Sequence, residues 1–150
     1  MSTTATRRNL TYATVDAIIA DVQSLRRGYT KCGNWTLPQI CWHLTTVMEK
    51  TGRPATEPAT AEQLKMRPIL EQILAQGRLP RPIEAPAPAV PPAHCDDASI
   101  DAFIAALQKL SVYPEKTAVH RVFGPLTADE YLKLSLIHSA HHLSHLTATA

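Results

Sequence analysis

A proline-rich segment in the middle of the chain constrains its fold more than any other feature. Six prolines lie between residues 78 and 93, namely Pro80, Pro82, Pro86, Pro88, Pro91 and Pro92. Proline has no backbone N–H and its ring clashes with a preceding helical turn, so neither a helix nor a central strand can form there. We predict an extended, polyproline-like crossover. The alternative is a disordered linker between two domains, which we reject because neither flank has enough apolar helix for its own core.

Amphipathic helical patterns lie on both sides of this crossover. Two of them open on a capping box, in which the side chains of Thr36 and Gln39, or of Thr127 and Glu130, satisfy free amides of the first helical turn. Such a box marks where a helix begins. The four main patterns span about residues 15–27, 36–50, 97–110 (or from 99) and 127–146.

A further helical pattern, from Ala61 to Gln76, is interrupted by Pro68, which should kink a helix or mark its true start. No stretch alternates apolar and polar residues for long enough to predict a strand. The sequence therefore predicts an all-α fold in a single domain, residues 1–150. We expect a four-helix bundle with a long Pro-rich crossover between its second and third main helices.

Composition and charge exclude several classes of protein. The formal net charge is +2 with neutral histidines, and Lys and Arg are scattered, so we expect no nucleic-acid partner. The residues MSTTATRRN lead into no apolar segment, and no window approaches the roughly 18 uninterrupted apolar residues of a membrane span, so we expect neither a secretory signal nor a membrane partner. The cysteines are odd in number and widely spaced, which is typical of a reducing compartment and predicts a cytoplasmic protein. They are Cys32, Cys41 and Cys95.

Four of the seven histidines lie close together near the C-terminus, as His138, His141, His142 and His145. On a helical wheel at about 100° per residue, with the charged residues of the last pattern marking the solvent side, His138 and His142 fall on the inward face. His141 falls nearest the charged side, and His145 is intermediate. The inward pair is spaced i, i+4, so both imidazoles can bind one metal ion.

His43 lies on another predicted helix, among the apolar residues Ile40, Leu44 and Val47. Two ligands from one helix and a third from another is a common way to build a metal site between packed helices. We therefore predict a site for one divalent ion, zinc or nickel, because imidazole suits both metals. The alternative is that these histidines are ordinary core or surface residues whose ring nitrogens have other hydrogen-bond partners.

Other residues are candidates for the surroundings of this site. His120 lies in the segment before the last helix, where a loop could overhang the site. We expect an ordinary exposed loop; the alternative is that His120 contacts an anion or a substrate, or acts as an acid behind the metal ligands. His141 and His145 are expected beside or behind the ligands, and His120 or His145 would be the fourth ligand of a closed site. Trp35 is expected to pack at the entry to the second helix, with stacking on a substrate as the alternative.

Several short motifs, taken in their order and spacing, make the chain resemble a known superfamily. They are Arg7-Arg8 with Leu10, then Gly33-Asn34-Trp35-Thr36-Leu37-Pro38-Gln39 running into Trp42-His43-Leu44, then Phe123-Gly124-Pro125-Leu126-Thr127, and finally His138 with His141-His142. In these motifs the chain resembles the DinB/YfiT-like superfamily of metal-binding four-helix bundles, and more narrowly a DinB-like branch without assigned function. The resemblance covers nearly the whole chain.

The resemblance implies a metal site of three histidines, one from the second helix and two from the last. Carried over residue by residue, they are His43, His138 and His142, the same three that the helical pattern selects. Many relatives have Gln where this chain has His145, so the resemblance implies no fourth ligand. Some relatives are metal-dependent transferases or isomerases that use a low-molecular-weight thiol.

These observations lead to three hypotheses about function. The first is a metal-dependent enzyme that acts on a small-molecule substrate, by thiol S-transfer or by hydrolysis, in which the ion acidifies a bound thiol or water. The second is a non-catalytic bundle that binds a metal or small ligand in sensing or assembly. The third is an interaction domain that binds no metal. Bundles of this type often pair through an outer helix face, so a homodimer is a possible partner arrangement.

Overall fold

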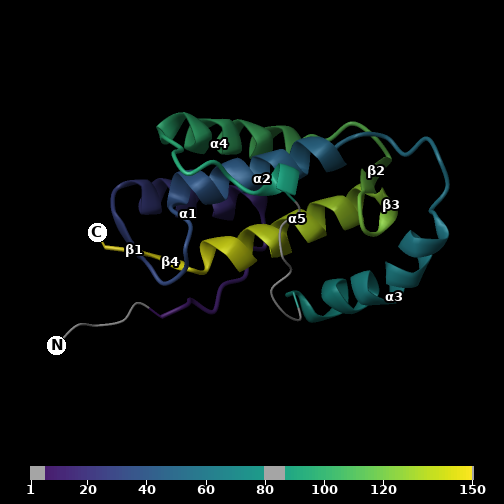
Figure 1. The fold of residues 1–150 in the computed structure, drawn as a ribbon, viewed down its shortest axis with the longest axis horizontal. Helices are drawn as coiled ribbons and strands as arrows, with labels where there is room; N and C mark the ends of the chain where they lie inside the picture. Colours follow the sequence, from purple (N-terminus) through teal and green to yellow (C-terminus); the bar gives the residue numbers. More distant parts are fainter. Residues whose placement is uncertain (1–5, 80–86, 150) are drawn as a thin grey trace.

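Five α-helices, one 3-10 helix and two pairs of short strands form the regular structure of residues 6–79 and 87–149, the part of the chain that the computed structural model describes (Figure 1). The helices are α1 (Val15–Arg26), α2 (Leu37–Thr51), α3 (Ala61–Gln76), α4 (Asp97–Ser111) and α5 (Ala128–Leu143), and the 3-10 helix is η1 (Ala87–Ala89). The strands are β1 (Tyr29–Lys31), β2 (Thr117–His120), β3 (Gly124–Thr127) and β4 (Leu146–Ala148). The helix bounds follow the sequence patterns closely, except that α5 ends earlier than expected.

The prediction of an all-α four-helix bundle is wrong in two respects. Residues 61–76 form a complete fifth helix, and four strands form two antiparallel sheets, in which β1 pairs with β4 and β2 pairs with β3. Each strand is only three or four residues long, too short to show the alternation from which strands are predicted. Tertiary contacts rather than local pattern therefore decide where these strands form.

Helix α3 continues through Pro68 because contacts on both sides of the proline stabilise it. A capping box of Thr60 and Gln63 satisfies the amides of its first turn. Beyond the proline, Leu70 and Ile73 are fully buried. Packing and capping together outweigh the backbone hydrogen bond that proline cannot make.

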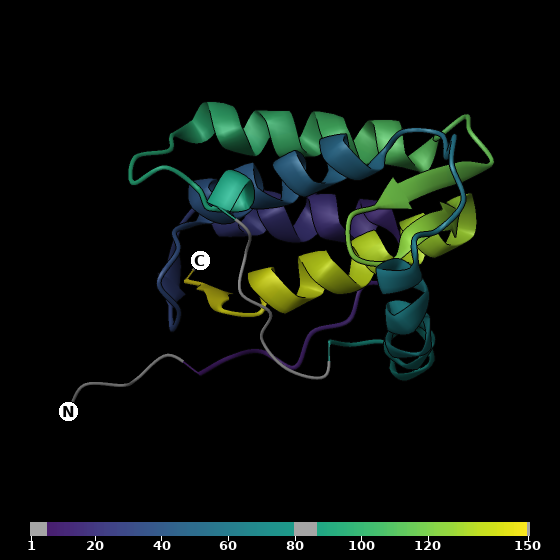
Figure 2. The same cartoon turned by 45° about the vertical axis from the view of Figure 1, so that its right-hand side comes forward.

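Helices α1, α2, α4 and α5 pack around the core, with α4 lying along α2, while α3 packs against α5 beside the β2–β3 hairpin (Figure 2). The largest fully buried side chains come from all five helices and from the β3 and β4 strands: Ile18, Leu25, Leu37, Leu44, Leu70, Ile73, Ile100, Phe103, Leu107, Leu126, Leu143 and Leu146. Within the described ranges, every helix is too short or too polar to span a bilayer.

The two ends of the chain hold the last turn of α5 in place. Strand β4 pairs with β1, which lies in the connection between α1 and α2. Before α1, the backbone N–H of Arg8 donates to the carbonyl of Ser144 at 2.8 Å, and its guanidinium binds Asp21 of α1 and the carbonyl of Leu143. These contacts attach the end of α5 to the N-terminal segment, to α1 and to β1.

The predicted extended crossover falls partly on residues 80–86, which lie outside the described residues. In the part that follows, Ala87–Ala89 form the single 3-10 turn η1, so this stretch is not extended. Ala89 and Pro91 are buried against the bundle, and η1 contacts α2. The crossover thus passes close to the helix that carries His43.

Candidate metal centre

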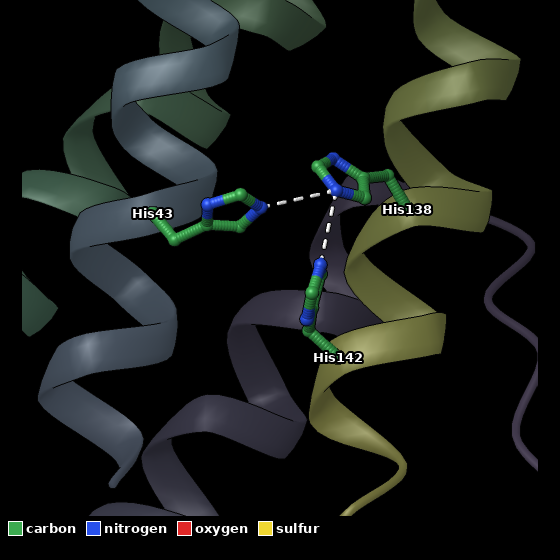
Figure 3. A group of neighbouring side chains, drawn as sticks. All are labelled: His43, His138 and His142. Carbon is green, nitrogen blue, oxygen red and sulfur yellow. Dashed lines mark hydrogen bonds between the residues drawn. The ribbon is translucent and has the colours of Figure 1, made fainter. Parts of the chain in front are cut away.

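Three histidine side chains converge between α2 and α5 (Figure 3). His43 lies in the middle of α2, and His138 and His142 lie one turn apart on α5. The Nε2 atom of His138 is 3.3 Å from Nε2 of His43 and 3.1 Å from Nε2 of His142. One ligand atom from each residue lies within 4.8 Å of the other two. The structure therefore brings together the three histidines that the helical pattern selects.

Local sequence positions each of these side chains. The capping box of Thr36 and Gln39 sets the start of α2 at Leu37. In the helix that follows, His43 and its neighbour Leu44 lie on the buried face. The capping box of Thr127 and Glu130 sets the start of α5 in the same way. Because buried residues of α5 recur on the side that faces the core, the i, i+4 histidine pair points towards α2.

The three imidazoles are held in their neutral form, which is the form that binds metal. His43 is only 3% exposed, and burial lowers its pKa, although a hydrogen bond to the Ala89 carbonyl acts in the opposite direction. Burial, followed by the influence of His43, lowers the pKa of His138 to about 3. Burial and then His138 lower the pKa of His142 as well. At neutral pH the cluster therefore carries no charge of its own.

The crossover sets the tautomer of His43. Its Nδ1 lies 2.7 Å from the carbonyl oxygen of Ala89, which can only accept a hydrogen bond. The ring proton is therefore on Nδ1, and Nε2 presents a lone pair to the other two histidines. A metal-binding histidine commonly has this arrangement, in which a carbonyl fixes the ring and raises the basicity of the ligating nitrogen.

The residues present fit a divalent metal ion. The three Nε2 atoms cannot all have hydrogen-bond partners while the imidazoles are neutral. Nε2 of His43 carries a lone pair, and Nε2 of His138 has at most one proton to donate to its two neighbours. A cation would accept a lone pair from each ring. Two nitrogens on a tetrahedral zinc ion, with bonds of about 2.0–2.1 Å, are separated by about 3.3 Å. The separations of 3.3 and 3.1 Å from His138 to the other two rings match this spacing, and all three ligand atoms lie within 4.8 Å of one another.

Trp35 forms one wall of the cluster. Its indole is stacked on the His142 ring, with centroids 5.4 Å apart and planes 20° from parallel, and its centroid is 5.0 Å from that of His43. Trp35 precedes α2, so it does pack at the helix entry as expected. It also restricts the orientation of two candidate ligands.

The other predicted site histidines lie outside this cluster. The Nδ1 of His141 is 2.8 Å from the guanidinium of Arg7, and the His145 ring lies against Gly33, where a Cβ would meet its Cδ2 at 3.2 Å. His120 ends β2 instead of lying in an overhanging loop, and its Nδ1 accepts hydrogen bonds from the backbone N–H groups of Val122 and Phe123. Within the described residues, none of these three histidines joins the group, so no fourth protein ligand is present there.

Two residues that act on or near the candidate site were not predicted for such a role, Ala89 in contact with His43 and Arg7 in contact with the neighbouring His141. The carbonyl of Ala89 carries no signal in the sequence, because any residue supplies a carbonyl. Arg7 donates to the Ser144 hydroxyl at 2.6 Å and contacts His141, and thereby attaches the N-terminal segment to the end of α5. Its only signal was its place in the Arg7-Arg8 motif.

Comparisons with known proteins identify a family for this chain but no individual relative. No curated protein and no solved structure matched the chain. A family profile described as "Protein of unknown function (DUF1569)" matches residues 4–149. Because this match covers almost all of the 150 residues, the chain belongs to the DUF1569 family.

Proposed function

We propose that this protein binds one divalent metal ion, zinc or nickel, through His43, His138 and His142. The observation that carries the proposal is the convergence of three neutral imidazoles, in which Nε2 of His138 lies 3.3 and 3.1 Å from Nε2 of the other two, the spacing of a metal's ligands. Both metals accept imidazole ligands, so the donor set alone does not choose between them.

We further propose that the bound metal serves a reaction on a small-molecule substrate, with S-transfer from a low-molecular-weight thiol preferred and hydrolysis as the variant. When bound, a divalent ion with three neutral ligands supplies a Lewis acid that lowers the pKa of a coordinated thiol or water. Unlike the buried His43, His138 and His142 are partly exposed, which leaves one side of the cluster accessible. The resemblance to the DinB/YfiT-like superfamily supports the choice of thiol transfer. Free cysteines at all three positions agree with a reducing compartment, for which we propose the cytoplasm.

A non-catalytic role in metal sensing or assembly is the second candidate. It is favoured by the position of two open cavities among the described residues, with volumes of about 450 and 300 Å³. One is lined by residues such as Leu10 and Arg78, the other by residues such as Trp42 and Glu49, and neither includes a histidine of the cluster. An enzyme needs a substrate pocket at the metal. Only an enzyme would consume a small thiol together with an electrophilic substrate, so turnover by the metal-loaded protein distinguishes the two functions.

The proposal is tested by elemental analysis of protein purified without a histidine tag. We expect about one equivalent of zinc or nickel in the wild type, and loss of that metal in His43→Ala and in His138→Ala. His94→Ala is the matched control, because His94 is exposed and lies outside the cluster. A wild type that binds no metal after reconstitution, or a His138→Ala variant with unchanged metal content, would contradict the proposed site.

A further inference from the structure

Two side chains on one face of α2 bind the last part of the crossover, residues 89–92. Gln39 and His43 are spaced i, i+4, so they lie one turn apart on the same face of the helix. The Nε2 of Gln39 donates to the Pro92 carbonyl at 3.1 Å, and the Nδ1 of His43 donates to the Ala89 carbonyl at 2.7 Å. The short segment from Ala89 to Pro92 is thus attached to α2 at both of its ends.

This segment has few other means of attachment. Pro88, Pro91 and Pro92 have no backbone N–H, so few backbone donors are left to attach the segment beyond the single turn η1. Among the described residues outside regular structure, no backbone–backbone hydrogen bond reaches residues 88–93 from elsewhere. Besides burial of Ala89 and Pro91, the side-chain contacts to this segment come from Gln39 and His43 of α2 and from Cys95, whose Sγ lies 3.8 Å from the Pro92 carbonyl.

Gln39 combines this attachment with a separate task at the start of α2. Its Oε1 accepts from the backbone N–H of Thr36 at 2.9 Å, which is one half of the capping box. Its amide nitrogen is not needed for the cap, since glutamate performs the same role in α5. Capping therefore requires only the side-chain oxygen of Gln39, and the N–H donor that binds Pro92 is present because this residue is glutamine and not glutamate.

We infer that Gln39 is a positioning residue for the metal ligand His43: by binding Pro92 it places the Ala89 carbonyl on Nδ1 of the His43 ring. This carbonyl fixes the tautomer that exposes the Nε2 lone pair and makes that nitrogen a stronger donor. The inference rests on the proposed function, because it assigns His43 as a ligand. Gln39 itself would touch neither metal nor substrate.

The chain contains a matched control for this inference. Gln63 occupies the same position of the capping box in α3, where its Oε1 accepts from the Thr60 N–H at 2.9 Å. Its Nε2 likewise donates to a distant carbonyl, that of Arg121, at 3.3 Å. The two glutamines differ in one respect. Only the segment bound by Gln39 also contacts a candidate metal ligand, through the hydrogen bond between the Ala89 carbonyl and His43.

The test compares Gln39→Glu with Gln63→Glu. Glutamate keeps the acceptor for the cap but has no donor for a carbonyl, so each change removes the long-range bonding of the amide nitrogen and preserves the helix start. In Gln39 this nitrogen bonds to Pro92 and, at 3.5 Å, to the carbonyl of Ala93, and in Gln63 to Arg121. We expect the dissociation constant for Zn²⁺, measured by chelator competition, to rise about 3- to 10-fold in Gln39→Glu, less than for loss of a direct contact to a ligand. Gln63→Glu should stay within about twofold of wild type, as a distant site does. The added negative charge attracts a cation, so it cannot by itself produce the expected loss.

A second readout needs no metal. In the metal-free wild type, the Nδ1 proton of His43 should give an NMR signal protected from exchange with water by its bond to Ala89, and Gln39→Glu should lose that protection. An unchanged Nδ1 signal in Gln39→Glu would overturn the inference, whatever the affinity does. If the wild type binds no metal but the signal is lost in Gln39→Glu alone, the proposed metal site is wrong and the positioning of the His43 ring by Gln39 stands.

Discussion

At the scale of single residues, the candidate site depends on which proton each imidazole keeps. The Ala89 carbonyl determines which ring nitrogen of His43 carries the proton, and hydrogen bonds from the backbone do the same for His120. In His120 the Nδ1 accepts from the N–H groups of Val122 at 3.0 Å and Phe123 at 3.3 Å, so its own proton is on Nε2. Burial, together with the adjacent Arg121, lowers the pKa of His120 to about 4.

This lowered pKa predicts an acid-sensitive contribution to stability. Between about pH 6.5 and 4 the unfolded chain binds a proton at His120 that the folded chain does not, so the free energy of unfolding falls as the pH falls. The contribution is complete above pH 6.5. His120→Asn offers an acceptor to the same N–H groups but does not titrate. We therefore expect the free energy of unfolding of this variant to fall less steeply with pH than that of the wild type, with a difference in slope of up to about 1.4 kcal/mol per pH unit. Urea unfolding at several pH values, with a chelator present, measures both slopes; parallel slopes would contradict the prediction.

At the scale of elements, helix α3, which continues through Pro68, is attached to α5 by an ion pair. The guanidinium of Arg67 binds a Glu130 carboxylate oxygen at 2.6 Å, with side chains that are 33% and 18% exposed. Burial acts to raise the pKa of Glu130, but the Thr127 backbone N–H and Arg67 outweigh it and hold this pKa below its usual value. The same carboxylate closes the capping box of α5, so one residue links the start of that helix to α3.

A double-mutant cycle with Arg67→Met and Glu130→Gln separates these two tasks. Glutamine preserves the capping box, as it does at Gln39 and Gln63, and removes only the charge. We expect a coupling free energy of about 0.5–1 kcal/mol, since the pair is partly buried and hydrogen-bonded. It should become smaller in 1 M salt. Chemical denaturation of the four proteins measures it, and additive effects of the two changes would show that the pair does not stabilise the docking of α3.

At the scale of the whole molecule, a metal ion at the cluster would join distant parts of the chain. His43 and His138 are 95 residues apart in sequence and come from different helices, and these ligands lie together only in the folded state. Binding energy at such a site is therefore largely added to folding stability.

We expect Zn²⁺ or Ni²⁺ to raise the melting temperature of the metal-free protein. At a free metal concentration about 100 times the dissociation constant, linkage adds about 2.7 kcal/mol, which for a chain of this size is about 5–10 °C. His94→Ala should show the same shift and His138→Ala none. Thermal unfolding followed by circular dichroism measures the effect, and a flat response of the wild type at saturating metal would instead favour an interaction domain without metal.

The sequence was informative wherever structure depends on neighbours within one or two helical turns. Helix positions follow from apolar spacing and from capping residues such as Thr36 and Thr127, and the inward pair His138 and His142 follows from the period of one helix. The same reasoning found the helical pattern of residues 61–76 but expected Pro68 to kink the helix or mark its true start, because the contacts that stabilise the complete helix α3 lie elsewhere in the chain.

Features that join distant segments emerged only in the folded molecule. The strands are too short to have a pattern of their own, and β1 finds β4 at the other end of the chain only after the helices pack. A backbone carbonyl is present at every residue, so nothing in the sequence marks Ala89 as the partner of His43. Local periodicity was enough to select the candidate ligands, but their orientation depends on hydrogen bonds between segments far apart in sequence, and such bonds exist only once the whole chain has folded.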